Sequence, residues 1–249
     1  MKIAILVPTR ERMNNRLTLL LSIITTANDI NNINIYYGVD KDDPTLDTIK
    51  KVASAIPSLK IVEIDNGGNF LGLGILWNKL VKASNEEIIS MIGDDMVFKT
   101  PGWDTMLLEE FNNMPEDQIQ AVHCNDDYHG AKLAVNLFCH RKYVDILGYF
   151  MREEFLINWV DQWLHQTFSA FGRLRYRNDI MIEHRHWVFG KTPRDNTAVR
   201  MNTANGKTDV ISDKMWHDLV DERISDVKKL GEYLKMKPDW SKVDTGNKL

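Results

Sequence analysis

Two adjacent carboxylates, Asp94 and Asp95, are the residues of this sequence whose position most clearly indicates chemistry. They follow an apolar run at residues 87–92, which is typical of a buried strand. Two acids at the end of such a strand destabilise the fold unless a cation neutralises them. A divalent metal held by oxygen ligands meets this need, and such a metal is often shared with substrate phosphates. A strand that simply ends in an Asp-rich turn is the alternative interpretation.

Polar residues also follow the other strands predicted in the first half of the chain. Apolar runs at 3–7, 33–39 and 59–64 predict strands, and helical spacing over 17–24, 45–56 and 71–83 separates them. This alternation predicts right-handed crossovers and a parallel sheet. The polar residues at the strand ends are Thr9, Arg10, Asp40, Asn66, Asp94 and Asp95. Because ligands bind at the carboxyl ends of such strands, we expect these residues to share one site.

The second half of the chain is less regular. Residues 103–111, 142–147 and 161–171 predict helices, and residues 119–123, 133–139, 174–176 and 180–182 predict strands. The last strand leads into Glu183-His184-Arg185-His186, where alternation predicts that the two histidines face opposite sides. Residues 208–235 predict an amphipathic helical tail with a candidate break at Gly231.

Composition limits the class of protein. The 249 residues suffice for one sizeable α/β domain, and the net charge of −4 with a pI of about 6.0 argues against a globally basic nucleic-acid binder. Cys124 and Cys139 are predicted to be buried free thiols in a reducing compartment. The N-terminus does not resemble a signal peptide, and no apolar run approaches the length of a membrane span. We therefore expect a cytoplasmic protein.

Several motifs follow one another in a set order along the chain. The first strand ends in Pro8-Thr9-Arg10, Asp40 follows the second, and residues 69–72 open a helix that carries Asn78. Asp94-Asp95 follows the fourth strand, and then come Leu147-Gly148-Tyr149-Phe150, Asp161-Gln162-Trp163-Leu164 and a strand that ends at His184. These ordered motifs resemble those of a family 2-like glycosyltransferase of the GT-A fold, over roughly residues 2–190. The chain departs from the family pattern at Val160 and Trp163, which replace acids, and in the lack of a third acid in the metal motif.

The resemblance implies a mixed, mainly parallel sheet flanked by helices, with a C-terminal helical tail. Residues 1–207 would form the GT-A domain, with a nucleotide-binding half at about 1–98 and an acceptor half at about 99–207. Residues 208–249 would form a helical extension. The resemblance also implies a nucleotide-sugar donor, with a UDP-sugar favoured, and Mn²⁺ or Mg²⁺ as cofactor.

The resemblance also implies roles for individual residues. Asp40 would bind the nucleotide base, and Asp95 and His184 would bind the metal. Asp161 would be the general base of an inverting reaction, although a plain helix N-cap is the alternative interpretation. The remaining donor-binding candidates are Pro8, Thr9, Arg10, Asn69, Asn78 and Asp94, and the secondary candidates are His186, Trp187 and Lys191.

Other functions stay open from the sequence. Basic residues concentrate at 173–194 (Arg173, Arg175, Arg177, Arg185, Lys191 and Arg194), which would suit a diphosphate or a nucleic-acid backbone. The pattern Glu183-His184-Arg185-His186 with Gly190-Lys191 resembles phage and bacterial glycosyltransferases. A phage-type enzyme that glycosylates hydroxymethylated or otherwise modified DNA bases, in the host cytoplasm, is therefore one alternative to a glycan acceptor. A nucleotidyltransferase is less favoured because residues 8–12 lack glycine. A non-catalytic nucleotide-sugar-binding module is a further alternative, and the oligomeric state stays open.

Overall fold

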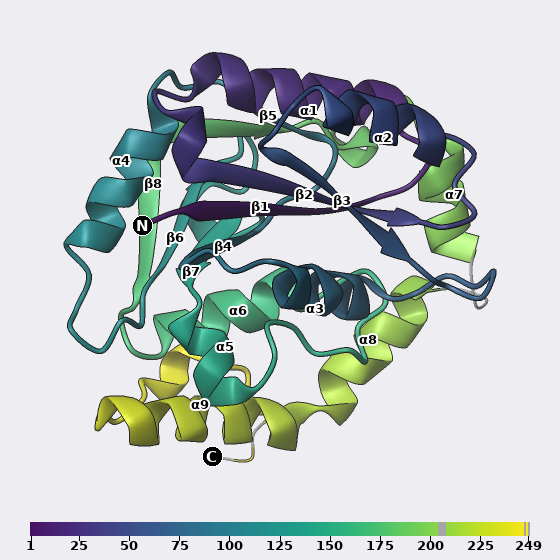
Figure 1. Ribbon diagram of the computed structural model, residues 1–249. Helices are drawn as coiled ribbons and strands as arrows, with labels where there is room; N and C mark the ends of the chain where they lie inside the picture. Colours follow the sequence, from purple (N-terminus) through teal and green to yellow (C-terminus); the bar gives the residue numbers. More distant parts are fainter. Residues whose placement is uncertain (204–207, 247, 249) are drawn as a thin grey trace.

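A mixed, mainly parallel sheet forms the centre of the computed structural model, which describes residues 1–203, 208–246 and 248 (Figure 1). Its strand order is β3-β2-β1-β4-β7-β6-β8-β5. The strands are β1 (Ile3–Thr9), β2 (Ile33–Asp40), β3 (Leu59–Ile64), β4 (Ile88–Met91), β5 (Met96–Phe98), β6 (Ala121–Asn125), β7 (Leu137–His140) and β8 (Leu174–His184). β1 to β4 are parallel, β7 runs antiparallel to β4 and β6, and β5 runs antiparallel to β8. The predicted α/β fold class is confirmed.

Helices cover both faces of this sheet because the buried strands present apolar side chains to both sides. Ile3, Ile5 and Val7 belong to one core with residues of α1 (Met13–Thr26), α2 (Leu46–Ser54) and α4 (Trp103–Asn112). Ala4 and Leu6 belong to a second core with α3 (Leu73–Ala83), α5 (Lys142–Leu147) and α6 (Val160–Ser169). Figure 1 shows these two layers above and below the sheet. The continuous apolar run of the first strand is therefore explained by burial on both faces.

The C-terminal helices complete the second core. The predicted tail is divided into α8 (Thr208–Asp218) and α9 (Val220–Leu234), so the expected break at Gly231 is wrong. Gly231 lies inside α9, where a Cβ atom would come within 3.2 Å of the Phe171 ring. The close approach of α9 to the core explains this glycine. A further helix, α7 (Asn196–Thr203), was not predicted.

Two further features of the fold agree with the sequence. Cys124 and Cys139 are buried free thiols, as predicted. Among the described residues, no helix has the length and apolar character needed to cross a bilayer.

A buried ion pair ties α1 to the loop after β2, beside the carboxyl end of β1. The side chains of Arg16 and Asp43 are both fully buried, and Arg16 also donates to Thr9 and Thr45. Burial alone would raise the pKa of Asp43, but hydrogen bonds from Thr45, the Glu11 N–H and Arg16 lower it to about 2. The ionised pair is therefore the folded form at neutral pH.

We expect Asp43→Asn to lower the free energy of unfolding by about 3–5 kcal/mol, because Arg16 would stay buried without a counter-charge. The measurement is urea unfolding at pH 7. The interactions that depress the pKa of Asp43 stabilise the fold fully at a pH above 3.8, the ordinary pKa of aspartate. This stabilisation is lost as the pH falls toward about 2, the pKa of Asp43 in the folded protein. The difference between the variant and the wild type should therefore shrink over that range. Glu63→Gln, which breaks the exposed Lys50–Glu63 pair, is the control and should change stability by less than about 1 kcal/mol. A loss below 1 kcal/mol for Asp43→Asn would contradict this account.

Candidate active site

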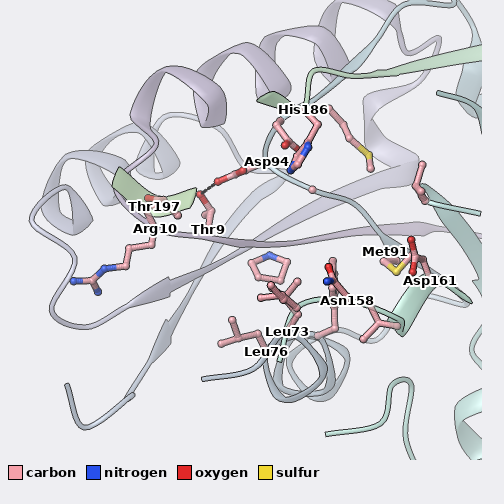
Figure 2. Close-up of a pocket in the computed structure, with 18 of the residues that line it drawn as sticks. Thr9, Arg10, Leu73, Leu76, Met91, Asp94, Asn158, Asp161, His186 and Thr197 are labelled. Carbon is pink, nitrogen blue, oxygen red and sulfur yellow. Dashed lines mark hydrogen bonds between the residues drawn. The ribbon is translucent and has the colours of Figure 1, made fainter. Parts of the chain in front are cut away.

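A cavity of about 700 Å³ opens at the carboxyl ends of β1, β2 and β4. Figure 2 shows Arg10 and Thr9 at one side of this cavity and Asp161 and Met91 at the other. Most of the site residues proposed from the sequence line it: Pro8, Thr9, Arg10, Asp40, Asp94, Asp95, Asp161, His184, His186 and Trp187. The expectation that polar strand ends gather in one place is thus confirmed for β1, β2 and β4.

The pairing of β5 with β8 brings Asp95 and His184 together. Met96 pairs with His184 in this antiparallel ladder, which places His184 beside the carboxylate that precedes β5. The Oδ1 atom of Asp95 lies 3.4 Å from Nε2 of His184, and the two side chains are 13% and 17% exposed. A Cβ atom on Gly93 would lie 2.7 Å from Asp95 Oδ1, so this orientation of Asp95 requires glycine at position 93. A carboxylate oxygen and an imidazole nitrogen therefore lie together at one point of the cavity wall.

The two groups stabilise each other's charged forms. Burial alone would raise the pKa of Asp95, but the hydrogen bond and charge of His184 lower it. Burial alone would lower the pKa of His184, but Asp95 raises it. Nδ1 of His184 is buried without a hydrogen-bond partner in the described residues, so its ring is oriented by the contact at Nε2.

This pair fits a divalent cation. Two ligands of one octahedral ion lie about 3 Å apart, close to the observed separation of the two atoms. In the part of the chain that the structure describes, no group of three or more His, Cys, Asp or Glu side chains forms a ready-made metal site. A cation here would thus take its other ligands from water and a bound phosphate, as Mg²⁺ commonly does.

Asp94 is oriented differently from its neighbour Asp95. It accepts a hydrogen bond of 2.7 Å from the Thr9 hydroxyl, drawn in Figure 2, and one of 2.8 Å from Arg12. Burial raises the pKa of Asp94 despite the opposing charge of Arg12, and the charge of Asp95 adds to the increase. Arg12 also holds Asp195 through two hydrogen bonds. Arg12 lines the cavity and was missed in the sequence, where only its place beside Arg10 hinted at a role.

Asp40 lies at the end of the cavity formed by β1 and β2. Its carboxylate accepts a hydrogen bond of 2.9 Å from Arg10 and lies 3.7 Å from Arg200 of α7. The hydroxyl of Thr197, also in α7, donates to the Arg10 carbonyl. Residues on α7 therefore contact this end of the cavity, a contribution that the sequence did not predict.

Asp161 lies in the first turn of α6 and lines the cavity. The N-cap of α6 is Trp159, so the alternative interpretation of Asp161 as the N-cap is wrong. Burial raises the pKa of Asp161, and the hydrogen bond from the Gln162 N–H offsets only part of this increase. A carboxylate with a raised pKa is a stronger base than an ordinary one.

Some residues proposed from the sequence lie elsewhere. Among the described residues, the cavity lining does not include Asn66, Asn69, Asn78 or Lys191. Asn78 is buried, and its amide accepts hydrogen bonds from the N–H groups of Phe150 and Met151, so it anchors that loop. Asn69 is exposed, and Lys191 pairs with Asp127 at 2.7 Å.

The His186 ring points to the same cavity as the His184 ring, which differs from the sequence prediction. The ring centroids of His184 and His186 are 5.3 Å apart, and both rings line the cavity. β8 ends at His184, so the alternation of a strand no longer applies at His186. The prediction that the two rings face opposite sides is wrong.

The basic residues at 173–194 are largely neutralised by acids. Arg173 pairs with Asp117, Arg177 with Glu110 and Asp179, Arg185 with Glu183, and Lys191 with Asp127. Arg194 lies over the Trp187 ring. These contacts argue against a continuous cationic surface for a nucleic-acid backbone.

No protein-family model and no curated protein matches the sequence. Solved structures do match the fold. One is a mannosyltransferase, PcManGT, from Pyrobaculum calidifontis in complex with GDP-Man and Mn²⁺. It has a TM-score of 0.59 and 15% identity, with 94% of this chain and 74% of that chain covered. Another is S. aureus TarS 1-349 in complex with UDP-GlcNAc, with a TM-score of 0.58 and 14% identity, covering 94% of this chain and 81% of that chain.

A third similar structure is glucosyl-3-phosphoglycerate synthase from Mycobacterium tuberculosis in complex with Mn²⁺, UDP and phosphoglyceric acid. Its TM-score is 0.54 at 13% identity, with 81% of this chain and 77% of that chain covered. The chain covers only 44% of a longer S. aureus TarS structure. At these identities the likeness establishes the fold, which is the GT-A fold of glycosyltransferases.

We expect His184→Ala and Asp95→Ala each to weaken Mn²⁺ binding in the presence of UDP by at least about 10- to 100-fold, the loss typical even for outer-shell partners of a metal. The measurement is a calorimetric Mn²⁺ titration at fixed UDP. His217→Ala removes an exposed histidine of α8 and is the control. An unchanged Mn²⁺ affinity in both site variants would rule out these ligands.

Proposed function

We propose that the protein is a metal-dependent glycosyltransferase that moves a sugar from a nucleotide-sugar donor, a UDP-sugar in the favoured case, to an acceptor hydroxyl. One observation carries the proposal: Asp40, the Asp95–His184 pair and Asp161 line the same cavity. Asp40 would bind the nucleobase, and Asp95 with His184 would bind a cation. Asp161 would act as the general base for the acceptor hydroxyl. Mn²⁺-containing and nucleotide-sugar complexes among proteins of the same fold support this assignment.

Each group has a defined task in the proposed reaction. The Asp40 carboxylate accepts N–H donors of the base, beside Pro8. Asp95 and His184 hold Mn²⁺ or Mg²⁺, which when bound stabilises the charge that develops on the leaving diphosphate. Asp161 takes the proton of the acceptor hydroxyl as that oxygen attacks the anomeric carbon from the face opposite the nucleoside diphosphate. The bond from the anomeric carbon to the diphosphate breaks in the same step, so the configuration is inverted.

The organisation of the chain forms part of the same proposal. Residues 1–207 act as the transferase domain, and residues 208–249 as a C-terminal extension whose helices α8 and α9 contribute to the second core. The two buried thiols suit a reducing compartment, and we therefore favour a cytoplasmic location.

A thermal-shift screen of UDP- and GDP-sugars with and without Mn²⁺ tests the donor class. A ligand at 100 times its Kd stabilises a protein by about 2.7 kcal/mol. For a chain of this size that free energy corresponds to a rise in Tm of roughly 5–10 °C. We expect this rise only when a nucleotide sugar and Mn²⁺ are both present. The absence of a shift with every donor would contradict the proposal.

Asp161→Asn should lower kcat by about 10²- to 10⁴-fold, the usual contribution of a general base, with little change in donor affinity. The measurement is steady-state release of the nucleoside diphosphate in the presence of acceptor. Asp145→Asn, an exposed carboxylate on α5, is the control and should retain full activity. Wild-type turnover by Asp161→Asn would exclude the base role.

The pH profile gives an independent test of Asp161. The base acts in its ionised form, so activity is present above its pKa and falls as the pH drops through it. Because burial raises the pKa of Asp161, the acid limb of kcat should lie above pH 3.8, the ordinary pKa of aspartate. The residual activity of Asp161→Asn at saturating Mn²⁺ should lack this limb. Retention of the limb in the variant would assign it to another group.

A further inference from the structure

One face of α8 holds the segment that leads into Asp161. Its contact residues are Asp209, Ser212, Asp213 and Trp216, whose spacing of three, four and seven positions places them on the same side of a helix. Each contacts one of residues 157–159. Asn158 donates to Asp209 at 3.1 Å, the Ile157 N–H to Ser212 at 3.4 Å, and the Trp159 indole to Asp213 at 2.6 Å, while the Trp159 ring stacks on Trp216. The C-terminal extension therefore builds one wall of the cavity.

Trp159 is held firmly in this wall. Its ring centroid lies 4.7 Å from that of Trp216 at an interplanar angle of 24°, and Trp216 is itself only 3% exposed. The backbone of Trp159 adopts a φ of 76°, a conformation that a bulky residue rarely adopts. Such a conformation persists only when its surroundings strongly constrain it. Trp159 lines the cavity two residues before Asp161, so it presents a rigid aromatic surface near the proposed base.

The charges of the cavity are separated between its ends. Arg10, Arg12 and Arg200 contact Asp40 and Asp94 at the end formed by the strand tips. Asp209 and Asp213 line the same cavity beside Asn158 and Trp159, which precede the proposed base Asp161 in the chain. Figure 2 shows Asn158 on the same side of the cavity as Asp161, away from Arg10. Two carboxylates therefore flank Trp159 in this wall of the cavity.

We propose that Trp159, Asp209 and Asp213 form an acceptor subsite for a neutral saccharide. The apolar face of a sugar ring would stack on Trp159, and its hydroxyls would donate to the two carboxylates, whose lone pairs exceed the hydrogen bonds that they already accept. A phosphate-bearing acceptor, such as a nucleic-acid backbone, would meet like charge here and be rejected. This inference rests on the proposed function and narrows its acceptor class.

Saturation-transfer NMR with UDP and Mg²⁺ tests the subsite. The probes are the methyl glycosides of glucose, galactose, mannose and N-acetylglucosamine, together with glucose 6-phosphate and mannose 6-phosphate. We expect at least one neutral glycoside to bind the wild type and both phosphates to be excluded. Trp159→Ala should weaken glycoside binding by roughly 10-fold or more, and Trp159→Phe, which keeps the ring and preserves packing on Trp216, by less.

A charge variant tests the exclusion separately. Asp209→Asn with Asp213→Asn keeps an oxygen acceptor for Asn158 and for the Trp159 indole, so the wall should stay in place. We expect this double variant to bind the sugar phosphates at least about 10-fold more tightly than the wild type does. Asp218→Asn removes an exposed charge of α8 outside the cavity and is the control. It should change neither the affinity for the neutral glycosides nor that for the sugar phosphates.

The affinities for UDP and GDP, measured in parallel, separate the two hypotheses. If neither UDP nor GDP binds the wild type, the proposed function is refuted and this subsite with it. If either nucleotide binds but no neutral glycoside does, or if Trp159→Ala and Trp159→Phe bind the glycosides as the wild type does, the subsite is wrong while the donor site stands. Equal binding of the sugar phosphates and the neutral glycosides by the wild type would overturn the charge-based exclusion.

Discussion

The adjacency of Asp94 and Asp95 at the end of a buried strand is the constraint on which the site depends. Two carboxylates there repel each other and lose hydration. The protein separates their environments. Arg12 pairs with Asp94 and the Thr9 hydroxyl donates to it, whereas Asp95 lies in the cavity wall with His184. The antiparallel pairing of β8 with β5 brings His184 to Asp95. The second half of the sheet thus supplies the group that compensates the charge of Asp95. A bound cation would replace the Nε2 proton of His184 and compensate the Asp95 carboxylate in its place.

Local sequence patterns predicted much of the fold, but they did not predict which strands pair across long distances in the sequence. The strand at residues 3–7 was predicted because burial on both faces leaves a continuous apolar run. The order of β7, β6, β8 and β5 across the sheet depends on partners distant in sequence, which no local pattern encodes. Gly231 illustrates the opposite error, since a glycine that suggests a helix break is instead required by the contact with Phe171.

For the site as well, local sequence patterns predicted some residues, and long-range contacts determined others. Residues directly after strands, such as Asp40 and Asp95, were predictable because the carboxyl ends of parallel strands meet at one edge. The place of Trp159 in the cavity wall was not predicted, because its contact with Asp213 joins residues 54 positions apart. Asn78 shows that a residue within a family motif serves the packing of a loop in this chain. Motif order thus predicted the centre of the site, whereas its outer wall required the tertiary structure.

The most direct test of the central claim is anomalous diffraction at the manganese edge from crystals soaked with MnCl₂ and UDP. The account predicts a single strong peak within about 2.2 Å of a carboxylate oxygen of Asp95 and of Nε2 of His184, with phosphate oxygens of UDP completing the shell. A crystal in which UDP is bound but manganese lies away from both side chains, with Asp95 and His184 still in contact with each other, would contradict it.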